Sequence, residues 1–300
     1  MPRLPKVVVY AVNASAEHSL MLLRSVQSIR RCSDVAITVF RFGPMHPTIV
    51  EMLEKMGVVL HERPARAEIN PTFLKWLALC EVNATVALFA DTDTFFFRAP
   101  ELLIEGLGGA SFAARLEVGC QSAEPEWCGG MQVMPQFSFE KMHTLATSLG
   151  GRQVPVFNTG VMLLRQGLLG QLRRTLCKKI ESINTSFESD WSVYPSTNSH
   201  IADEVAASLA FGTWPGFSWT PMNDVSAPFY LELRSTLKAT AAVVHTWSHY
   251  YPDFLDDYIS KESGALHRML ARTMRESTVT SVRIKAMRAA LAALGAPQLP

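Results

Sequence analysis

The sequence predicts one α/β domain built on a mostly parallel central sheet with helices on both faces. Its first ninety residues alternate between short β-rich runs and helical stretches, in the order β-α-β-α-β-α-β. Parallel strands need crossover connections, and right-handed crossovers place helices over both faces of such a sheet. The chain has 300 residues, 48% of them hydrophobic and 18% charged, so it can bury a large core and is not disordered.

The individual elements follow from hydrophobic periodicity and from the flanking Gly and Pro residues. The predicted strands of the first part are Val7–Tyr10, Val35–Phe40, Val58–His61 and Thr85–Ala90, and the helices between them are His18–Ile29, Pro47–Lys55 and Pro71–Cys80. Gly pairs and polar segments from Gly106 to Pro155 predict loops with one strand at Ser111–Arg115. The remaining predictions are a strand at Val161–Leu164, helices after Gly167 and at Ile201–Phe211, an apolar run at Ala241–Val244 and a tail helix at Ser277–Leu294.

Charge and cysteine content limit the partners and the compartment. There are 28 Lys and Arg residues against 27 Asp and Glu residues, so no global field attracts nucleic acid. The five cysteines form no CxxC pair, which favours reduced thiols and a cytoplasmic protein. No apolar run reaches the roughly 18 residues of a membrane-spanning helix, although the basic tail helix could pack as an oligomer contact or lie on a membrane surface.

Two carboxylates follow an apolar predicted strand. Asp91 and Asp93 lie two residues apart just after Val86–Ala90, and side chains at that spacing project to one side of an extended chain. Such a pair can share one hard cation or act on one substrate group. The alternative is a turn in which one of the two carboxylates caps backbone amides.

An ordered set of segments around this pair resembles a known enzyme family. Phe73-Leu-Lys75-Trp76 precedes Asp91-Thr92-Asp93, and Arg98-Ala-Pro100-Glu101 follows it. In this order the segments are similar to the glycogenin-like, family 8 group of glycosyltransferases. The resemblance implies a GT-A fold. It also implies that Asp91-Thr92-Asp93 is a DxD motif that holds a metal ion on the diphosphate of a nucleotide sugar. Mn²⁺ is the expected ion, with Mg²⁺ as the alternative, and UDP is the expected nucleotide. The resemblance also implies a glycosyltransferase domain over residues 1–255, with a nucleotide-binding half at 1–105 and an acceptor-side half at 106–255, followed by a helical tail at 256–300.

The same resemblance assigns roles to four later residues. Asn158 and Gly160 match a segment in which the Asn faces the donor sugar and the Gly allows close backbone approach, and Asp203 matches an acid near the reacting sugar. His245 matches a third metal ligand. Taken alone, these residues could equally be a turn entering a buried strand, a helix N-terminal charge and a histidine at a strand end.

Donor-binding residues are also implied on the N-terminal side. Tyr10, Ala11, Val12 and Asn13 follow the first strand, where similar proteins cradle the nucleotide base, although an ordinary strand-to-helix turn explains them equally well. The family commonly follows its metal-binding His with Gly and then Lys-Pro-Trp, whereas this chain reads His245-Thr-Trp247. Lys75, which otherwise reads as a solvated helix residue, therefore becomes the expected phosphate partner.

The acceptor is a carbohydrate or another hydroxyl compound that the sequence does not identify. Trp127, Trp247 and Tyr250 could stack on its sugar face or belong to loops and core. The resemblance further implies retention of the anomeric configuration. Two other functions remain open: a haloacid dehalogenase-like phosphatase with Asp91 as nucleophile and Asp256-Asp257 on Mg²⁺, and a non-catalytic nucleotide-sugar binding module.

Overall fold

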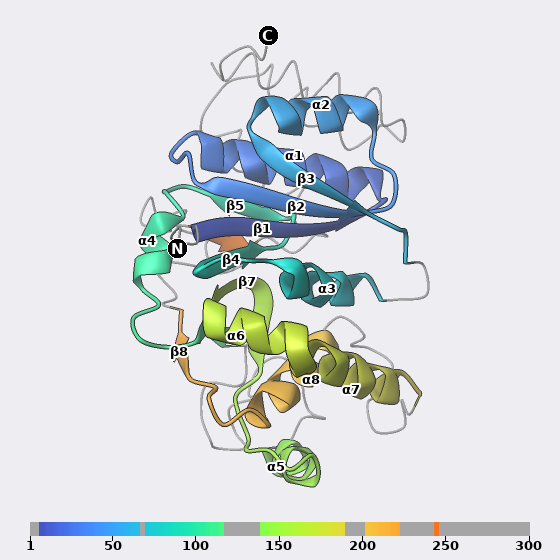
Figure 1. The fold of residues 1–300 in the computed structure, drawn as a ribbon, viewed down its shortest axis with the longest axis vertical. Helices are drawn as coiled ribbons and strands as arrows, with labels where there is room; N and C mark the ends of the chain where they lie inside the picture. Colours follow the sequence, from blue (N-terminus) through green and yellow to red (C-terminus); the bar gives the residue numbers. More distant parts are fainter. Residues whose placement is uncertain (1–5, 67–69, 117–138, 190–201, 223–242, 246–300) are drawn as a thin grey trace, which may run out of the picture. The chain divides into compact units, whose positions relative to one another are not determined.

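The structure, a computed structural model, describes residues 6–66, 70–116, 139–189, 202–222 and 243–245 (Figure 1). Its strands are β1 (Lys6–Asn13), β2 (Ala36–Phe42), β3 (Val58–Arg63), β4 (Val86–Ala90), β5 (Thr94–Phe96), β6 (Phe112–Leu116), β7 (Phe157–Arg165), β8 (Trp219–Pro221) and β9 (Val243–His245). Its helices are α1 (Ala16–Arg30), α2 (Pro47–Lys55), α3 (Leu74–Glu81), α4 (Glu101–Glu105), α5 (Phe139–Ser148), α6 (Gln166–Gln171), α7 (Cys177–Ser189) and α8 (Ala202–Gly212). A 3₁₀ turn at Pro71–Phe73 precedes α3, and a π-helical segment at Leu172–Leu176 joins α6 to α7.

Seven of the strands form a mixed, mostly parallel sheet in the order β3-β2-β1-β4-β7-β6-β8. The pairs β1·β4, β2·β3 and β6·β8 are parallel, whereas β7 runs antiparallel to both β4 and β6. The two short strands β5 and β9 form a separate antiparallel pair. The predicted α/β class with a mostly parallel sheet is therefore confirmed.

The chain divides into two compact units. Unit 1 contains residues 1–9, 67–90 and 101–224, and unit 2 contains residues 10–66, 91–100 and 225–300. The division falls inside β1, so both units take part of that strand. It does not follow the predicted halves at 1–105 and 106–255, which remain a prediction.

Unit 2 is organised around α1, whose ends and buried face are set by local sequence. Ser15 caps the helix by accepting a hydrogen bond from the His18 amide at 3.4 Å. Most of α1 is buried, including the hydroxyl residues Ser25 and Ser28 as well as the apolar ones. Gly43 follows β2 with φ +105°, and a side chain there would also press on Ala14 and Ala65. Glycine is therefore required at that turn.

Unit 1 has an aromatic core. The ring of Phe112 in β6 lies 5.0 Å from the ring of Phe157, 5.3 Å from that of Phe211 and 5.7 Å from that of Phe217, measured between centroids. All four side chains are at most 2% exposed. Aromatic rings at these distances contribute about 0.5–1.5 kcal/mol per pair beyond their buried area. The cluster joins β6, β7 and the C-terminal end of α8.

Several elements differ from the sequence-based expectation. Helix α5 lies inside the stretch that we expected to be loops. Phe139, Met142, Leu145 and Ala146 have helical spacing, but the Gly pairs and polar segments around them dominated the prediction. The single helix expected after Gly167 is a longer run of α6, the π-helical segment and α7. Asp91 to Asp93 form a turn between β4 and β5, so strand alternation is not what brings their side chains together.

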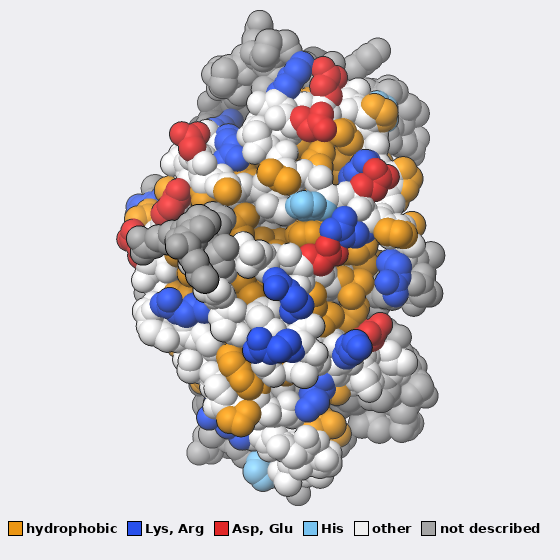
Figure 2. All heavy atoms as spheres, viewed as in Figure 1, with side chains coloured by type: hydrophobic (Ala, Val, Ile, Leu, Met, Phe, Trp, Pro, Cys, Tyr) orange, Lys and Arg blue, Asp and Glu red, His pale blue; other side chains and the backbone are white. Residues whose placement is uncertain are grey.

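Charges of both signs are mixed on the surface, as the nearly equal numbers of acidic and basic residues suggest. Figure 2 shows acidic and basic side chains side by side on the face that it draws. Among the described helices, none is both long enough and apolar enough to cross a membrane. The predicted tail helix at Ser277–Leu294 lies outside the described residues.

Candidate active site

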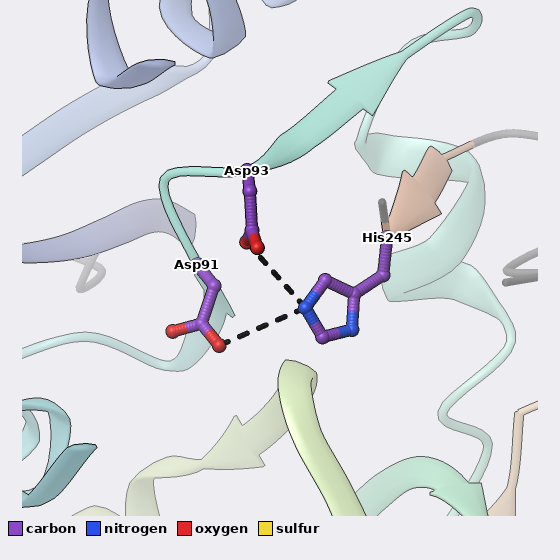
Figure 3. Close-up of side chains that lie close together, drawn as sticks. All are labelled: Asp91, Asp93 and His245. Carbon is purple, nitrogen blue, oxygen red and sulfur yellow. Dashed lines mark ion pairs between the residues drawn. The ribbon is translucent and has the colours of Figure 1, made fainter. Parts of the chain in front are cut away.

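Three potential metal ligands lie together in unit 2. Asp91 and Asp93 come from the turn before β5, and His245 is the last residue of β9, which pairs antiparallel with β5. The register places His245 opposite Thr94, the residue directly after Asp93. Figure 3 shows the imidazole of His245 directed toward both carboxylates. This local sheet thus brings together residues that are far apart in sequence.

The distances in this cluster suit one shared cation. Nε2 of His245 lies 3.4 Å from Oδ1 of Asp93 and 3.9 Å from Oδ2 of Asp91. One ligand atom from each residue lies within 4.8 Å of the other two. Two carboxylates and one imidazole form a donor set that suits Mn²⁺, whereas Mg²⁺ prefers oxygen ligands alone.

Asp93 is the more deeply buried of the two acids, at 7% exposure. Burial raises the pKa of its carboxyl, but the charge of His245, a hydrogen bond to His245 and a backbone hydrogen bond outweigh burial, so the pKa is lowered. His18 of α1 lowers the pKa of Asp93 further. A carboxylate that stays ionised while buried is prepared to bind a cation.

A second polar cluster lies in unit 1 around Asp203, at the start of α8. Nζ of Lys75 lies 3.4 Å from Oδ2 of Asp203, and it donates a hydrogen bond to Oγ1 of Thr159 at 2.8 Å. Both side chains are nearly enclosed, Lys75 at 8% exposure and Asp203 at 1%. Lys75 is therefore not a solvated helix residue, because burial of an ammonium requires a partner of this kind.

Glu204 holds the beginning of β7 in this second cluster. Its Oε1 accepts hydrogen bonds from the Thr159 amide at 2.9 Å and from Nδ2 of Asn158 at 3.3 Å. Oδ1 of Asn158 in turn accepts from the Gly160 amide at 3.1 Å. The orientation of the Asn158 amide is therefore fixed on both sides.

One carboxylate oxygen of this cluster can accept a further hydrogen bond. Within the described part of the chain, Oδ1 of Asp203 is buried and has no hydrogen-bond partner. Leaving a buried acceptor unpaired costs about 1–3 kcal/mol. A hydroxyl donor from a ligand would satisfy this oxygen.

The end of β1 belongs to unit 2. Asn13 accepts hydrogen bonds from the Ser15 amide and from Nδ1 of His18, both at 3.0 Å, so its side chain organises the turn into α1. The Tyr10 side chain is fully buried, and its hydroxyl lies 2.7 Å from Oγ of Ser25. The buried Tyr10 ring cannot stack on a nucleotide base, and a contact from the backbone of Tyr10, Ala11 and Val12 remains a prediction.

The structure thus places the predicted site residues in distinct groups. It brings together Asp91, Asp93 and His245 in unit 2, and Lys75, Asn158 and Asp203 in unit 1. Thr92 is buried in the turn between the two acids. The proposed acceptor residues Trp127, Trp247 and Tyr250, and the Asp256-Asp257 pair of the phosphatase alternative, lie outside the described residues.

Sequence reasoning missed Thr159 and Glu204 as site residues. Thr159 contacts Lys75, Asp203 and Glu204 through one hydroxyl oxygen. Threonine is a common strand residue, so its position in β7 carried no chemical signal. The adjacent acids Asp203 and Glu204 could have indicated two separate partners.

Comparison with protein-family models and with curated protein sequences gives no match. Solved structures do match. GlyE of Streptococcus pneumoniae TIGR4, a glycosyltransferase, is 14% identical with a TM-score of 0.52, over 80% of this chain and 54% of GlyE. The bifunctional glycosyltransferase WbbM is 10% identical with a TM-score of 0.52, over 84% of this chain and 49% of WbbM. An active-site mutant of LgtC is 14% identical with a TM-score of 0.50, over 84% of this chain and 95% of LgtC.

The described fold is therefore that of the GT-A glycosyltransferases, as the resemblance implied. At these identities the likeness shows the fold alone. This chain spans about half the length of GlyE and of WbbM. What the chain does has to be argued from its own residues.

Proposed function

We propose that this chain is a metal-dependent glycosyltransferase that moves a sugar from a nucleotide-diphosphate sugar, with UDP as the nucleotide, to a hydroxyl acceptor. The observation that carries the proposal is the convergence of Asp91, Asp93 and His245 on one point in a chain with the GT-A fold. In such a transfer, negative charge grows on the departing diphosphate while the sugar becomes cationic at its anomeric carbon. A cation bound by these three residues would stabilise the charge on the diphosphate.

The cluster in unit 1 supports the sugar side of the proposal. Asn158 and Asp203 keep the roles that the family resemblance implies, and Oδ1 of Asp203 can accept a hydrogen bond from a sugar hydroxyl. Glu204 orients Asn158 through the hydrogen bond between their side chains. Lys75 holds Asp203 in place and balances its charge. A phosphate contact by Lys75 remains a prediction.

Three further points belong to the same proposal. Mn²⁺ is the preferred ion because one of the three ligands is an imidazole. Retention of the anomeric configuration follows from the family resemblance, and NMR of the first-formed product tests it. A reducing, cytoplasmic environment stays part of the proposal, because the five cysteines include no CxxC pair.

One experiment separates the candidate functions. The protein is titrated calorimetrically with UDP, with and without Mn²⁺, and the release of UDP from a panel of UDP-sugars is then followed with water as acceptor. Mn²⁺-dependent binding with slow donor hydrolysis supports the transferase. Binding without turnover supports a nucleotide-sugar binding module. Phosphate release from an aryl phosphate, without UDP binding, supports the phosphatase alternative and contradicts the proposal.

A further inference from the structure

A line of three buried hydroxyl groups runs through unit 2 and ends at the turn that carries the metal ligands. The Tyr10 hydroxyl lies 2.7 Å from Oγ of Ser25, which lies 3.0 Å from Oγ1 of Thr94, and Oγ1 of Thr94 lies 2.8 Å from the carbonyl oxygen of Asp91. All three hydroxyl-bearing residues are 0% exposed. None of these hydroxyl groups can therefore be satisfied by bulk solvent.

Proton counting fixes the direction of every hydrogen bond in this line. A carbonyl oxygen only accepts, so the single hydroxyl proton of Thr94 points to Asp91. Oγ1 of Thr94 must then accept from Ser25, and Oγ of Ser25 must accept from Tyr10. Burial raises the pKa of the Tyr10 phenol, so it remains a donor at every physiological pH. The order is therefore Tyr10 to Ser25 to Thr94 to the Asp91 carbonyl.

Thr94 is connected to all three candidate ligands. Besides its hydroxyl, its backbone amide donates to the Asp91 carbonyl oxygen at 3.2 Å. It is also the register partner of His245 in the β5·β9 ladder. Asp93 precedes it directly in sequence. A displacement of Thr94 would therefore move the carboxylates relative to the imidazole.

We propose that Thr94 is a positioning residue for the metal centre, and that the Ser25 hydroxyl, which donates to Oγ1 of Thr94, directs the Thr94 hydroxyl onto the Asp91 carbonyl. This inference rests on the proposed function, because it assigns a role to the residues that support the cation ligands. Outer partners of metal ligands typically change metal affinity by about 10–100-fold when they are removed. The hydroxyl of Thr94 holds the backbone of a ligand rather than its side chain, so we expect the lower end of that range.

The variants differ in which bond of the line they remove. Thr94→Val keeps the branched shape that suits a strand and removes the last donor, whereas Thr94→Ser keeps that donor. Tyr10→Phe removes the phenol hydroxyl, which interacts with Ser25 and more weakly with Thr94, and leaves the Ser25–Thr94 and Thr94–Asp91 hydrogen bonds in place. Thr94→Val and Tyr10→Phe therefore each remove one buried oxygen, but only Thr94→Val removes a hydrogen bond to the Asp91–Asp93 turn.

The first measurement is the Mn²⁺ affinity of the full chain by titration calorimetry. We expect Thr94→Val to bind Mn²⁺ about tenfold more weakly than the unaltered protein. Thr94→Ser should restore the affinity, and Tyr10→Phe should leave it nearly unchanged while lowering the melting temperature. Equal weakening by Thr94→Val and Tyr10→Phe, or no weakening by Thr94→Val, would overturn the inference.

The second measurement is amide hydrogen exchange at residue 94 without metal. Exchange should be faster by about tenfold in Thr94→Val than in Thr94→Ser or Tyr10→Phe, because the valine variant loses the hydroxyl that helps to fix the acceptor of that amide. If the unaltered protein binds no Mn²⁺, the metal part of the proposed function fails, and the exchange result alone decides whether Thr94 holds the turn. Uniform exchange in all variants would overturn the positioning role.

If Thr94→Val is too unstable to measure, Ser25→Ala tests the positioning role of Thr94 instead. Ser25→Ala removes the donor that directs the Thr94 hydroxyl, yet it leaves the Thr94 side chain in place. We then expect a smaller loss of Mn²⁺ affinity, about two- to threefold, together with faster exchange at residue 94. Unchanged affinity and exchange in Ser25→Ala would count against the directed line of hydroxyls.

Discussion

Lys75 and Asp203 form an ion pair inside unit 1, with 3.4 Å between Nζ and Oδ2 and with side chains 8% and 1% exposed. Such a pair gains little over an apolar pair of the same shape, but the loss of one partner leaves an uncompensated buried charge. Its presence is therefore weak evidence for a stabilising role, and it is compatible with the role at the donor sugar that we propose for Asp203. The same reasoning gives the first prediction.

Lys75→Met and Asp203→Asn should each lower the free energy of unfolding by about 3–5 kcal/mol, because each leaves one charge unpaired. The double variant should be more stable than the sum of the two losses predicts, by about 1–3 kcal/mol. Urea unfolding of the four proteins measures this coupling. The exposed pair Lys55–Glu51 is the control, and its coupling should not exceed about 0.5 kcal/mol. Additive losses for Lys75 and Asp203 would contradict a direct interaction.

Asp93→Asn should weaken Mn²⁺ binding by more than about 100-fold, since it replaces a charged ligand rather than an outer partner. Metal-dependent release of UDP from UDP-sugars should disappear with it. Calorimetry and a UDP-release assay follow the two effects. Asp34→Asn, an exposed acid of the same unit, is the matched control and should behave as the unaltered protein. Full turnover in Asp93→Asn would remove the metal cluster from the mechanism.

Mn²⁺ affinity should fall as the pH falls from 7.5 to 5.5, by about tenfold. The pKa of Asp93 is lowered by His245, so this carboxyl stays ionised throughout that range. The imidazole of His245 can bind the ion only when it is neutral, so its protonation competes with Mn²⁺. His245→Asn should bind Mn²⁺ more weakly at pH 7.5. The variant also loses the charge and the hydrogen bond that keep the pKa of Asp93 low, so burial should raise that pKa, and Mn²⁺ affinity should still fall toward pH 5.5. An Mn²⁺ affinity of the unaltered protein that does not change between pH 7.5 and 5.5 would contradict this competition.

Phe112→Ala should lower the free energy of unfolding by about 3–5 kcal/mol, because it opens a cavity among three surrounding rings. Leu102→Ala, at a side chain that is 51% exposed, should change it by no more than about 0.5 kcal/mol. Chemical unfolding followed by tryptophan fluorescence compares the two variants. Similar losses in both would argue against the aromatic core of unit 1.

Local pattern predicted the alternating half of the fold well. Strands β1 to β4 and helices α1 to α3 each satisfy their own periodicity, and parallel pairing follows from the crossovers between them. The antiparallel insertion of β7 between β4 and β6 could not be predicted, because it depends on pairing between distant segments. The same holds for the β5·β9 ladder, whose strands have three residues each.

The sequence predicted which residues belong to the candidate metal site, but not the local structure that brings them together. Family resemblance pointed to Asp91, Asp93 and His245, but the expected cause, strand alternation, is replaced by a turn and a cross-strand pair. Thr159 and Thr94 escaped notice because a threonine in a strand usually reports only β propensity. Their importance comes from the number of polar partners around one buried oxygen, and sequence does not record that number.

The position of β9 has a consequence for the order in which the centre can assemble. Asp93 and His245 are about 150 residues apart in sequence, so any ion that they share would close a long loop, as a crosslink does. Binding of the ion to this site would stabilise the native state by about 2.7 kcal/mol at an ion concentration a hundred times the dissociation constant. During translation the imidazole of His245 is the last of the three ligands to emerge from the ribosome. A nascent chain halted before Val243 would therefore contain both carboxylates but not the third ligand that completes the metal site.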